Sequence, residues 1–346
     1  MDITIAGMLA VDGLTNGAIY ALLGLATVMV FAVTRVIFIP QGEFVAFGAL
    51  TLAMFIDHKV PGTVWLLLIM ALVVALQEGV GAVRAGAPFQ QALTRAVKPL
   101  LIPFTTAGLS IWLAPHELPM WSMVLLSLAL VTAMGPLLYR LAYQSLESAT
   151  PLVLLIVSVG VHFALTGLAL LFFGPEGFRN PAFWDERLQI GTVPINGQAV
   201  IIFVTALLFI VALWYFFGNT LFGKALRATA VNRNGARLMG ISTHTAGQLT
   251  FTLAAFIGAL SGLLIGPTTT ILYDSGFLIG LKGFVAAVIA GLASYPGALV
   301  VALGVGLVEA FSSFWASAFK EVIVFALILP ALWLRSRHVT DDEEEH

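Results

Sequence analysis

Long apolar stretches recur along almost the whole chain and restrict it to one class of fold. A helix needs about 20 mostly apolar residues to cross a membrane. Eleven stretches approach this length: 8–34, 40–56, 61–79, 99–114, 118–139, 151–174, 198–217, 246–266, 277–294, 296–315 and 318–335. Backbone in lipid must form helices or a closed barrel, and the sequence lacks the strand-length alternation of a barrel. We therefore expect an all-α polytopic membrane protein with about 9–11 transmembrane helices.

Two of the stretches are weaker than the others. Residues 99–114 are few and include Pro99 and Pro103, which favours a tilted or re-entrant segment. Residues 277–294 include Lys282, which favours a broken helix that lines something polar. The composition supports the class, since 60% of the residues are hydrophobic and 10% are charged, against about 25% charged in soluble domains. A water-soluble enzyme is excluded.

The lysines and arginines predict the orientation, because cytoplasmic loops of membrane proteins are enriched in them. With the N-terminus outside and the C-terminus in the cytoplasm, eleven basic residues lie inside and five outside. The inside set is Arg35, Arg84, Arg95, Lys98, Arg140, Lys224, Arg227, Arg233, Arg237, Arg335 and Arg337. We expect a single transmembrane permease domain (1–340), with an outer loop at 175–197, a cytoplasmic loop at 218–245 and a solvated acidic tail at 341–346.

The sequence contains no recognisable motif for catalysis or metal binding. Residues 218–225 (GNTLFGKA) resemble a phosphate-binding loop, but Ala225 replaces the hydroxyl residue, and a membrane helix stands where a strand should precede it. There is no cysteine, no pair of histidines at metal-ligand spacing and no serine in a nucleophile motif. The net charge of −2 gives no sign of a nucleic-acid partner. We expect no catalytic residue, no metal and no enzyme activity.

Glycines at steps of four predict close helix packing, because they allow two backbones to approach. Gly258, Gly262 and Gly266 form such a row, and Gly13 with Gly17 repeats the spacing. Gly276 with Gly280 repeats it again. We expect these rows to pack within the chain, and an interface between subunits is the alternative.

The cytoplasmic loop carries the strongest functional signal. Residues 223–241 read GKALRATAVNRNGARLMGI, with four basic residues and no acidic one. The pattern predicts a short basic helix, a break near Asn232 to Gly235, and a further turn. By itself it fits either a helix lying on anionic lipid headgroups or an element that docks on another protein.

This segment resembles the cytoplasmic coupling segment of the permease subunits of branched-chain amino acid ABC importers, which read like GRALRAVA-x-REAARLLGI. Three further stretches resemble that family in the same order: residues 13–22 (GLTNGAIYAL), residues 35–38 with 42–44 (RVIF and GEF), and residues 280–285, 294–298 and 306–309 (GLKGFV, SYPGA and GLVE). The motifs favour the H-type subunit. The chain departs from the family at Asn234, Gly235 and Gln41, and residues 61–135 look expanded.

The resemblance implies an ABC importer permease fold and a function in moving branched-chain or related amino acids across the bacterial inner (plasma) membrane. It implies three kinds of partner besides the lipid bilayer: a second permease subunit, two cytoplasmic ABC ATPases and an extracytoplasmic substrate-binding protein. This chain would bind no cofactor, since ATP and Mg²⁺ belong to the ATPases. The residues implied in coupling are Gly223, Lys224, Arg227, Arg233, Asn234, Gly235, Ala236, Arg237 and Gly240.

Polar residues within spans are costly in hydrocarbon and are functional candidates for that reason. The candidates for the translocation pathway are Asn16, Gly42, Glu43, Phe44, Lys282 and Glu309. The alternative for the polar ones is a hydrogen bond or salt bridge that fixes helix packing, and for Lys282 a position at the outer interface. We expect His162 to be a packing residue with one hydrogen bond.

Two other functions stay open at this point. One is an ABC permease for urea, amides or another small solute, because the membrane subunit says little about the substrate. The other is a secondary carrier driven by protons or sodium, in which intramembrane carboxylates would couple the ion to the solute. The basic cytoplasmic loop fits the carrier poorly.

Overall fold

The apolar stretches fold into helices that run alternately up and down a bundle. The computed structural model describes residues 3–191, 193–292 and 294–333. In that part of the chain, nine helical segments are long and apolar enough to cross a membrane. They are Ile3–Thr34, Ile39–Ile56, Gly62–Arg84, Phe89–Leu113, Met120–Leu146, Pro151–Phe173, Gly197–Asn219, Thr243–Ile265 and Tyr295–Trp315. The number confirms the lower end of the predicted range.

The individual helices divide these segments as follows. The first half of the chain forms α1 (Ile3–Thr34), α2 (Glu43–Ile56), α3 (Gly62–Arg84), α4 (Phe89–Val97), α5 (Leu101–Leu113), α6 (Met120–Leu138) and α7 (Pro151–Phe173). The second half forms α8 (Gly197–Asn219), α9 (Leu221–Val231), α10 (Arg233–Leu238), α11 (Thr243–Ile265), α12 (Ser275–Ile289), α13 (Tyr295–Trp315) and α14 (Lys320–Ala326).

Two predicted spans are shorter than the sequence suggested. The stretch 277–294 gives α12, which has only 15 residues. Gly291 and Leu292 adopt positive φ angles of 85° and 57°, and their N–H groups donate to the carbonyls of Val288 and Ala287. This arrangement ends a helix. The stretch 318–335 gives α14, with a turn at Leu327 before further helical residues at 328–333.

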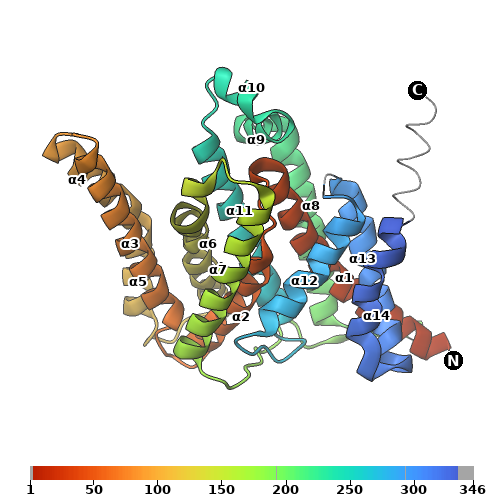
Figure 1. Cartoon of the computed structure of the whole chain (residues 1–346). Coiled ribbons are helices and arrows are strands. Elements are labelled where there is room, and N and C mark those ends of the chain that lie inside the picture. Colours follow the sequence, from red (N-terminus) through yellow and green to blue (C-terminus); the bar gives the residue numbers. More distant parts are fainter. Residues whose placement is uncertain (1–2, 192, 293, 334–346) are drawn as a thin grey trace, which may run out of the picture.

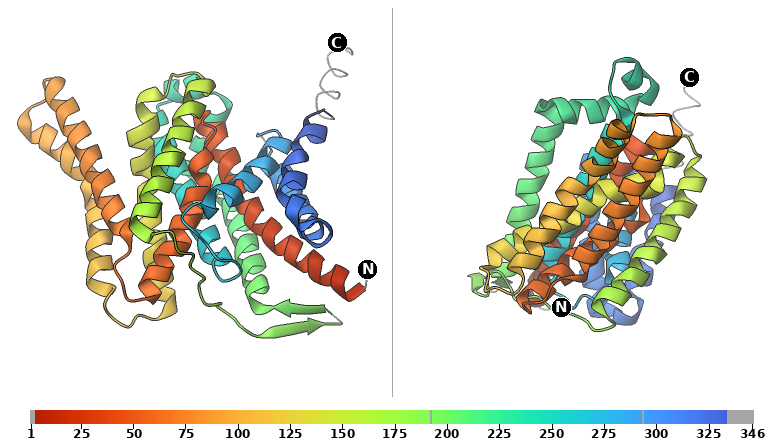
Figure 2. Two further views of the ribbon diagram at one scale, coloured as in Figure 1. Left: turned by 60° about the horizontal axis from the view of Figure 1, so that its bottom comes forward. Right: turned by 90° about the vertical axis from the view of Figure 1, so that its left-hand side faces the viewer.

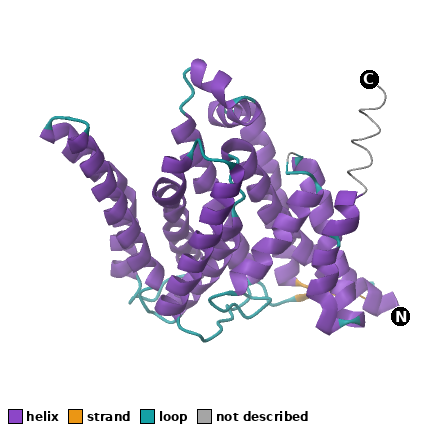
Figure 3. Ribbon diagram, in the orientation of Figure 1, coloured by secondary structure: helices purple, strands orange, loops and turns teal. Residues whose placement is uncertain are grey.

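The expectation of an all-α chain needs one small correction. Strands β1 (Arg187–Ile190) and β2 (Val193–Asn196) form an antiparallel hairpin inside the predicted outer loop. Figure 3 shows these short strands beside a structure made otherwise of helices and loops. A hairpin outside the spans does not conflict with a helical membrane domain. The acidic tail at 341–346 and the basic residues Arg335 and Arg337 lie outside the described residues.

Helix α1 crosses the middle of the bundle and packs against α8, α11, α12 and α13. Helices α3, α4 and α5 form an arm at one side that leans away from the other helices (Figure 1). Figures 1 and 2 show α4 and α9–α10 at one end of the bundle and the loop after α7, with its hairpin, at the opposite end. We call these the α9 end and the hairpin end.

The glycine rows pack within the chain, as predicted. A Cβ at Gly17 would lie 2.8 Å from the Cα of Leu303 in α13, closer than van der Waals contact allows. At a second crossing, Gly42 meets Gly276 and Gly280 of α12 backbone to backbone. Gly258 of the third row faces Phe44. These contacts hold α1, α2, α11, α12 and α13 together as the buried centre of the bundle.

Candidate functional site

A polar cavity of about 620 Å³ lies toward the hairpin end of the bundle. Three predicted pathway residues, Asn16, Lys282 and Glu309, line it together. The other polar residues in its wall are Asp12, Thr15, Tyr20, Arg179, Asn196, Thr268, Thr269, Ser275, Ser313, Lys320 and Glu321. Side chains from α1, α12, α13, α14 and the outer loops therefore line one cavity. The sequence alone does not predict which residues form its wall.

Lys282 is the centre of an ion-pair cluster in this cavity. Its Nζ lies 2.5 Å from Glu309 Oε1 on α13 and 3.1 Å from Glu321 Oε1 on α14. The Tyr20 hydroxyl of α1 donates to Glu309 Oε2 at 2.5 Å. Lys282 and Glu309 are only 5% and 7% exposed. Buried charges need partners of this kind, so Lys282 does not extend to the outer interface but joins three helices to α12.

The rest of the cavity wall carries both signs of charge. Asp12 and Asn16 stand four residues apart on α1 and therefore on one face of the helix. Arg179 comes from the outer loop, where its Nε donates to the carbonyl of Pro267 at 3.1 Å. Apolar side chains, among them Leu278 and Ile279, complete the lining. A small molecule with an anionic group, a cationic group and an apolar side chain would find a counterpart for each in this cavity.

Glu43 is placed elsewhere, in a buried contact between α2 and α7. It is fully buried, and its Oε1 lies 2.8 Å from Nδ1 of His162. Its Oε2 has no hydrogen-bond partner among the described residues. The ring of His162 packs at 4.6 Å from that of Phe277. The contact corresponds to the packing alternative for Glu43, and His162 makes the hydrogen bond expected of it.

Gly42 and Phe44 flank Glu43 and also lie away from the polar cavity. Gly42 is the crossing point of its segment with α12, described above. Phe44 is fully buried and has its ring 5.9 Å from that of Phe38. The structure therefore divides the six pathway candidates into three that line the polar cavity and three that pack between helices.

The predicted coupling segment forms two short helices at the α9 end. Thr220 caps α9 by accepting a hydrogen bond from the N–H of Gly223 at 3.0 Å, and Asn232 caps α10 by accepting one from Gly235 at 2.9 Å. Thr and Asn are favoured N-caps because they satisfy free N–H groups at a helix start. Asn232 also separates α9 from α10, at the break that the sequence predicts.

One face of α9 is anchored to the bundle. Leu226 is buried in a cluster with Val33 of α1 and Ala246 of α11. Gly223 packs directly on the backbone of Phe216. These contacts join α9 to α1, α8 and α11.

The outer face of the segment is basic and apolar together. Lys224, Arg227, Asn234, Arg237 and Gly240 are exposed. The sequence prediction omitted Val231, Leu238 and Met239, which are 85%, 88% and 82% exposed. A shallow groove of about 600 Å³ runs across this face. Exposed apolar side chains rimmed by charge are typical of a surface that binds another protein or the membrane surface.

Arg233 and Ala236 differ from the other coupling candidates. Arg233 forms an ion pair with Glu147, in the loop before α7, and Nδ1 of His244 lies 3.2 Å from the same carboxylate. Ala236 is buried, and Gly235 is partly buried against its Asn232 cap. These residues hold α10 in place, whereas Lys224, Arg227, Asn234, Arg237 and Gly240 are exposed.

Sequence reasoning missed Tyr20, Glu321 and Glu147. Tyr20 stands in an apolar span and reads as a core aromatic residue, and Glu321 adjoins Lys320 at the start of the last apolar stretch. The sequence does indicate that Lys282 has an acidic partner, because a lysine inside a span needs a carboxylate, and only a few acidic residues lie near a span. The sequence could not tell which of them is close in space.

Comparison with known proteins identifies the family. The family model described as "Branched-chain amino acid transport system / permease component" matches residues 99–332. The permease LivH of Escherichia coli K12, from a high-affinity branched-chain amino acid transport system, is 30% identical over 213 residues, which cover 60% of this chain and 69% of LivH. The permease BraD of Pseudomonas aeruginosa, from a system of the same description, is 31% identical over 217 residues, covering 60% and 70%.

Among solved structures, a chain of PsaBC from Streptococcus pneumoniae aligns with 93% of this chain and 89% of its own length, at 11% identity and a TM-score of 0.36. That score is too low to indicate a shared fold. The family model spans most of the chain, from the start of α5 into the last helical residues. Permeases of this family are non-catalytic, multi-pass membrane subunits without a cofactor of their own. This chain belongs to the branched-chain amino acid transport system permease family and resembles its LivH-type members.

Proposed function

We propose that this chain is the H-type permease subunit of an ABC importer that carries branched-chain or related amino acids into the cytoplasm of a bacterium. The polar cavity carries the proposal. An amino acid has a carboxylate, an ammonium group and a side chain, and the cavity offers Arg179 for the carboxylate, Asp12 for the ammonium group and aliphatic side chains for the side chain, within about 620 Å³.

The positions of the two candidate sites support this function. The polar cavity is lined by loops of the hairpin end, and the basic segment lies at the α9 end (Figure 1). If the α9 end faces the cytoplasm, as the excess of lysine and arginine favours, a solute delivered from outside meets the cavity first. ATPases in the cytoplasm then meet the coupling segment.

The proposed partners follow from this arrangement. ABC permeases work with ATPases and a binding protein, and we propose a second permease subunit, two cytoplasmic ATPases and an extracytoplasmic binding protein for this chain. Lys224, Arg227 and Arg237 would contact acidic groups on an ATPase, and Val231, Leu238 and Met239 would enter an apolar groove. ATP-driven movement of the ATPases would expose the cavity alternately to either side.

Co-purification from native membranes tests the proposal. The tagged chain is isolated in mild detergent, and its partners are identified by mass spectrometry. We expect a second permease and two ATPases, and loss of the ATPases in the variant Lys224→Glu/Arg237→Glu. Arg84→Glu is the matched control, because Arg84 is an exposed cation at the end of α3 outside the coupling segment.

Transport measurements separate the alternatives. Binding of leucine, isoleucine and valine to the co-purified binding protein would support branched-chain amino acids as the substrates. Binding of urea or amides alone would instead favour an ABC permease for those solutes. A chain that purifies without partners, and that takes up solute in liposomes on an ion gradient without ATP, would overturn the ABC reading. It would favour a secondary carrier that uses Glu309 or Glu43.

A further inference from the structure

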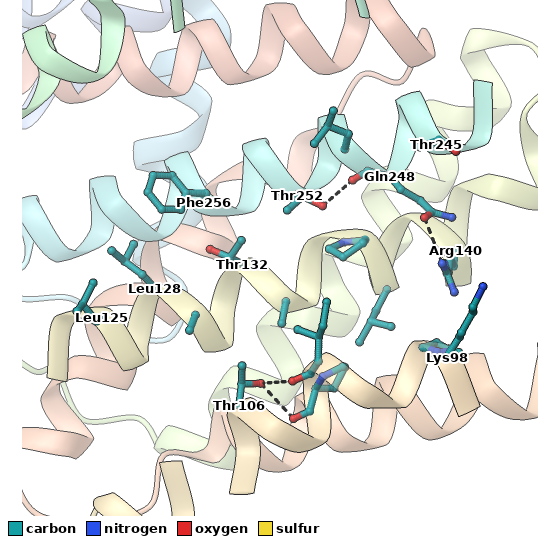
Figure 4. Close-up of a pocket in the computed structure, with 18 residues that line it drawn as sticks. Lys98, Thr106, Leu125, Leu128, Thr132, Arg140, Thr245, Gln248, Thr252 and Phe256 are labelled. Atoms are coloured by element: carbon teal, nitrogen blue, oxygen red, sulfur yellow. Dashed lines mark hydrogen bonds between the residues drawn. The ribbon is translucent and has the colours of Figure 1, made fainter. Parts of the chain in front are cut away.

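A second cavity, separate from the polar one, lies between α5, α6 and α11. It has a volume of about 720 Å³ and belongs to the side of the bundle that carries the arm. Most of its wall is aliphatic or aromatic, and Ile102 of α5 is part of it. Figure 4 shows Leu125 and Leu128 on α6 and Phe256 on α11. We call it the arm groove. Its lining gives a zwitterionic solute little to bind, so the transport function does not account for it.

Two cations stand at one end of the arm groove. Lys98 precedes α5 and Arg140 follows α6, and Figure 4 shows both at the same end of the lining residues. Arg140 donates to Gln248 Oε1 at 3.2 Å, while its Nε is buried without a hydrogen-bond partner among the described residues. Within the described part of the chain, no carboxylate lies within 4.0 Å of either cation.

The surroundings of these cations are basic as a whole. Arg140 also borders a smaller cavity that contains Arg95 and His244, with Glu78 as its acidic residue. Three cations thus gather where α4, α5 and α6 meet at the α9 end. A partly buried arginine without a carboxylate partner is unfavourable, and an anion from outside the chain would satisfy it.

The arm groove is long enough to hold a lipid tail. From Leu125 to Arg140 the chain advances fifteen positions, which is about 22 Å at the rise of an α-helix. One leaflet of a bilayer has a hydrocarbon thickness of about 15 Å. The groove is therefore longer than the leaflet is thick, and an acyl chain lying along α6 from the cations inward has room in it over the full depth of the leaflet on the α9 side.

We propose that the arm groove binds an anionic phospholipid from that leaflet, with the headgroup phosphate on Lys98 and Arg140 and an acyl chain against Leu128 and Phe256. Basic pockets between transmembrane helices on the cytoplasmic side are suited to anionic headgroups. An entirely apolar helix of a partner subunit would fill the apolar part of the groove but would leave the two cations without a counter-charge. The proposal does not depend on which solute the transporter carries.

Native mass spectrometry of the full chain tests the proposal. After delipidation in detergent, the protein is titrated with phosphatidylglycerol or with phosphatidylcholine of the same acyl chains, and retained lipid is counted. We expect phosphatidylglycerol to be retained preferentially, at one per chain. Each of the variants Lys98→Gln and Arg140→Gln is expected to weaken this binding about fivefold, whereas Arg84→Gln, at an exposed cation of α3, should not.

A second pair of variants tests the apolar part of the groove. Ala129→Phe places a ring in the groove, which Ala129 lines, and should weaken the retention of phosphatidylglycerol while all cations remain. Ala212→Phe makes the same change on the exposed face of α8 and should leave retention unchanged. Equal effects of Ala129→Phe and Ala212→Phe would overturn the proposal.

Photo-crosslinking in membranes identifies the occupant directly. Phosphatidylglycerol with a diazirine in its acyl chain should label peptides of α6 and α11 that line the groove. Labelling confined to outward faces such as that of α8 would mean that lipid only surrounds the protein, and the proposal would fail. It would also fail if the assembled transporter places a partner helix there and excludes the label.

Discussion

At the residue scale, Lys282 shows how a charge is kept inside a membrane protein. The lysine contacts Glu309 and Glu321, and Tyr20 donates to the other oxygen of Glu309. Both oxygens of Glu309 are bound, so removal of this carboxylate leaves the buried Lys282 with only the partly exposed Glu321 as an ion-pair partner among the described residues. Glu309 contacts both Lys282 and Tyr20, so a substitution of Glu309 tests the whole cluster.

We predict that Glu309→Ala lowers the free energy of unfolding by about 3–5 kcal/mol, the usual cost of removing one partner from a buried ion pair. The double variant Lys282→Met/Glu309→Leu should recover much of that stability without restoring transport. Thermal unfolding in detergent and amino acid uptake in cells measure the two effects. A double variant as unstable as the single one would show that the ion pair does not explain the loss.

The contact between Glu43 and His162 leads to a different expectation. Glu43→Gln keeps a hydrogen-bond acceptor next to Nδ1, so we predict that uptake by the ATP-supplied transporter stays near the wild-type rate. His162→Ala leaves Glu43 buried without this hydrogen bond and should reduce stability by about 1–3 kcal/mol. If the glutamine variant folds normally but loses transport, the charge itself is required, and Glu43 acts in more than packing.

At the scale of elements, α9 and α10 combine an anchored face with a free one. Leu226 and the pair of Arg233 with Glu147 hold the segment on the bundle, while Arg237 is exposed. The two arginines are close in sequence, yet they have different surroundings. A substitution at each should therefore have a different consequence.

We predict that Arg237→Glu reduces the amount of ATPase that co-purifies and leaves thermal unfolding unchanged. Arg233→Glu should destabilise α10, because two carboxylates would then face each other at Glu147, and the exchange Arg233→Glu/Glu147→Arg should restore ATPase binding. Co-purified ATPase per permease is the measurement. Without recovery in the exchanged variant, Arg233 would have to contact the ATPase itself.

The crossing of Gly42 with α12 gives a prediction about packing. A Cβ at Gly280 would lie 2.5 Å from the Cα of Gly42, so we predict that Gly280→Ala separates the two segments and lowers stability by about 1–3 kcal/mol. Gly160→Ala is the control, since a Cβ there meets nothing within 4 Å, and it should be neutral or slightly stabilising. Thermal unfolding of both variants in detergent compares them.

At the scale of the whole molecule, the sequence predicts the helices better than their lengths or contacts. Hydrophobicity over about 20 residues determines where a chain can cross lipid. For this reason the predicted spans from 8–34 to 246–266 coincide with α1, α2, α3, α5, α6, α7, α8 and α11. The end of α12 depends on the backbone conformation at Gly291 and Leu292, which hydrophobicity does not report. The hairpin at 187–196 depends on local pairing that no periodicity in the loop reveals.

The sequence predicts which type of residue forms the candidate site, but it does not predict which of those residues lie together. Polar residues in apolar spans pointed to Asn16, Lys282 and Glu309, which share the polar cavity. The same rule also selected Glu43, which pairs with His162 in another part of the bundle. The position of each side chain around its helix axis and the choice of neighbouring helix decide between the two outcomes, and both are properties of the assembled bundle.

Helix α1 has a mechanical consequence for the whole molecule. It runs unbroken for 32 residues, or about 48 Å at 1.5 Å per residue. Near one end it lines the polar cavity with Asp12 and Asn16, and near the other Val33 packs on Leu226 of α9. A rigid rod of this length that turns by about 5° around its midpoint moves its ends by about 2 Å in opposite directions. Any shift of α9 that α1 follows therefore acts as a lever on the cavity wall.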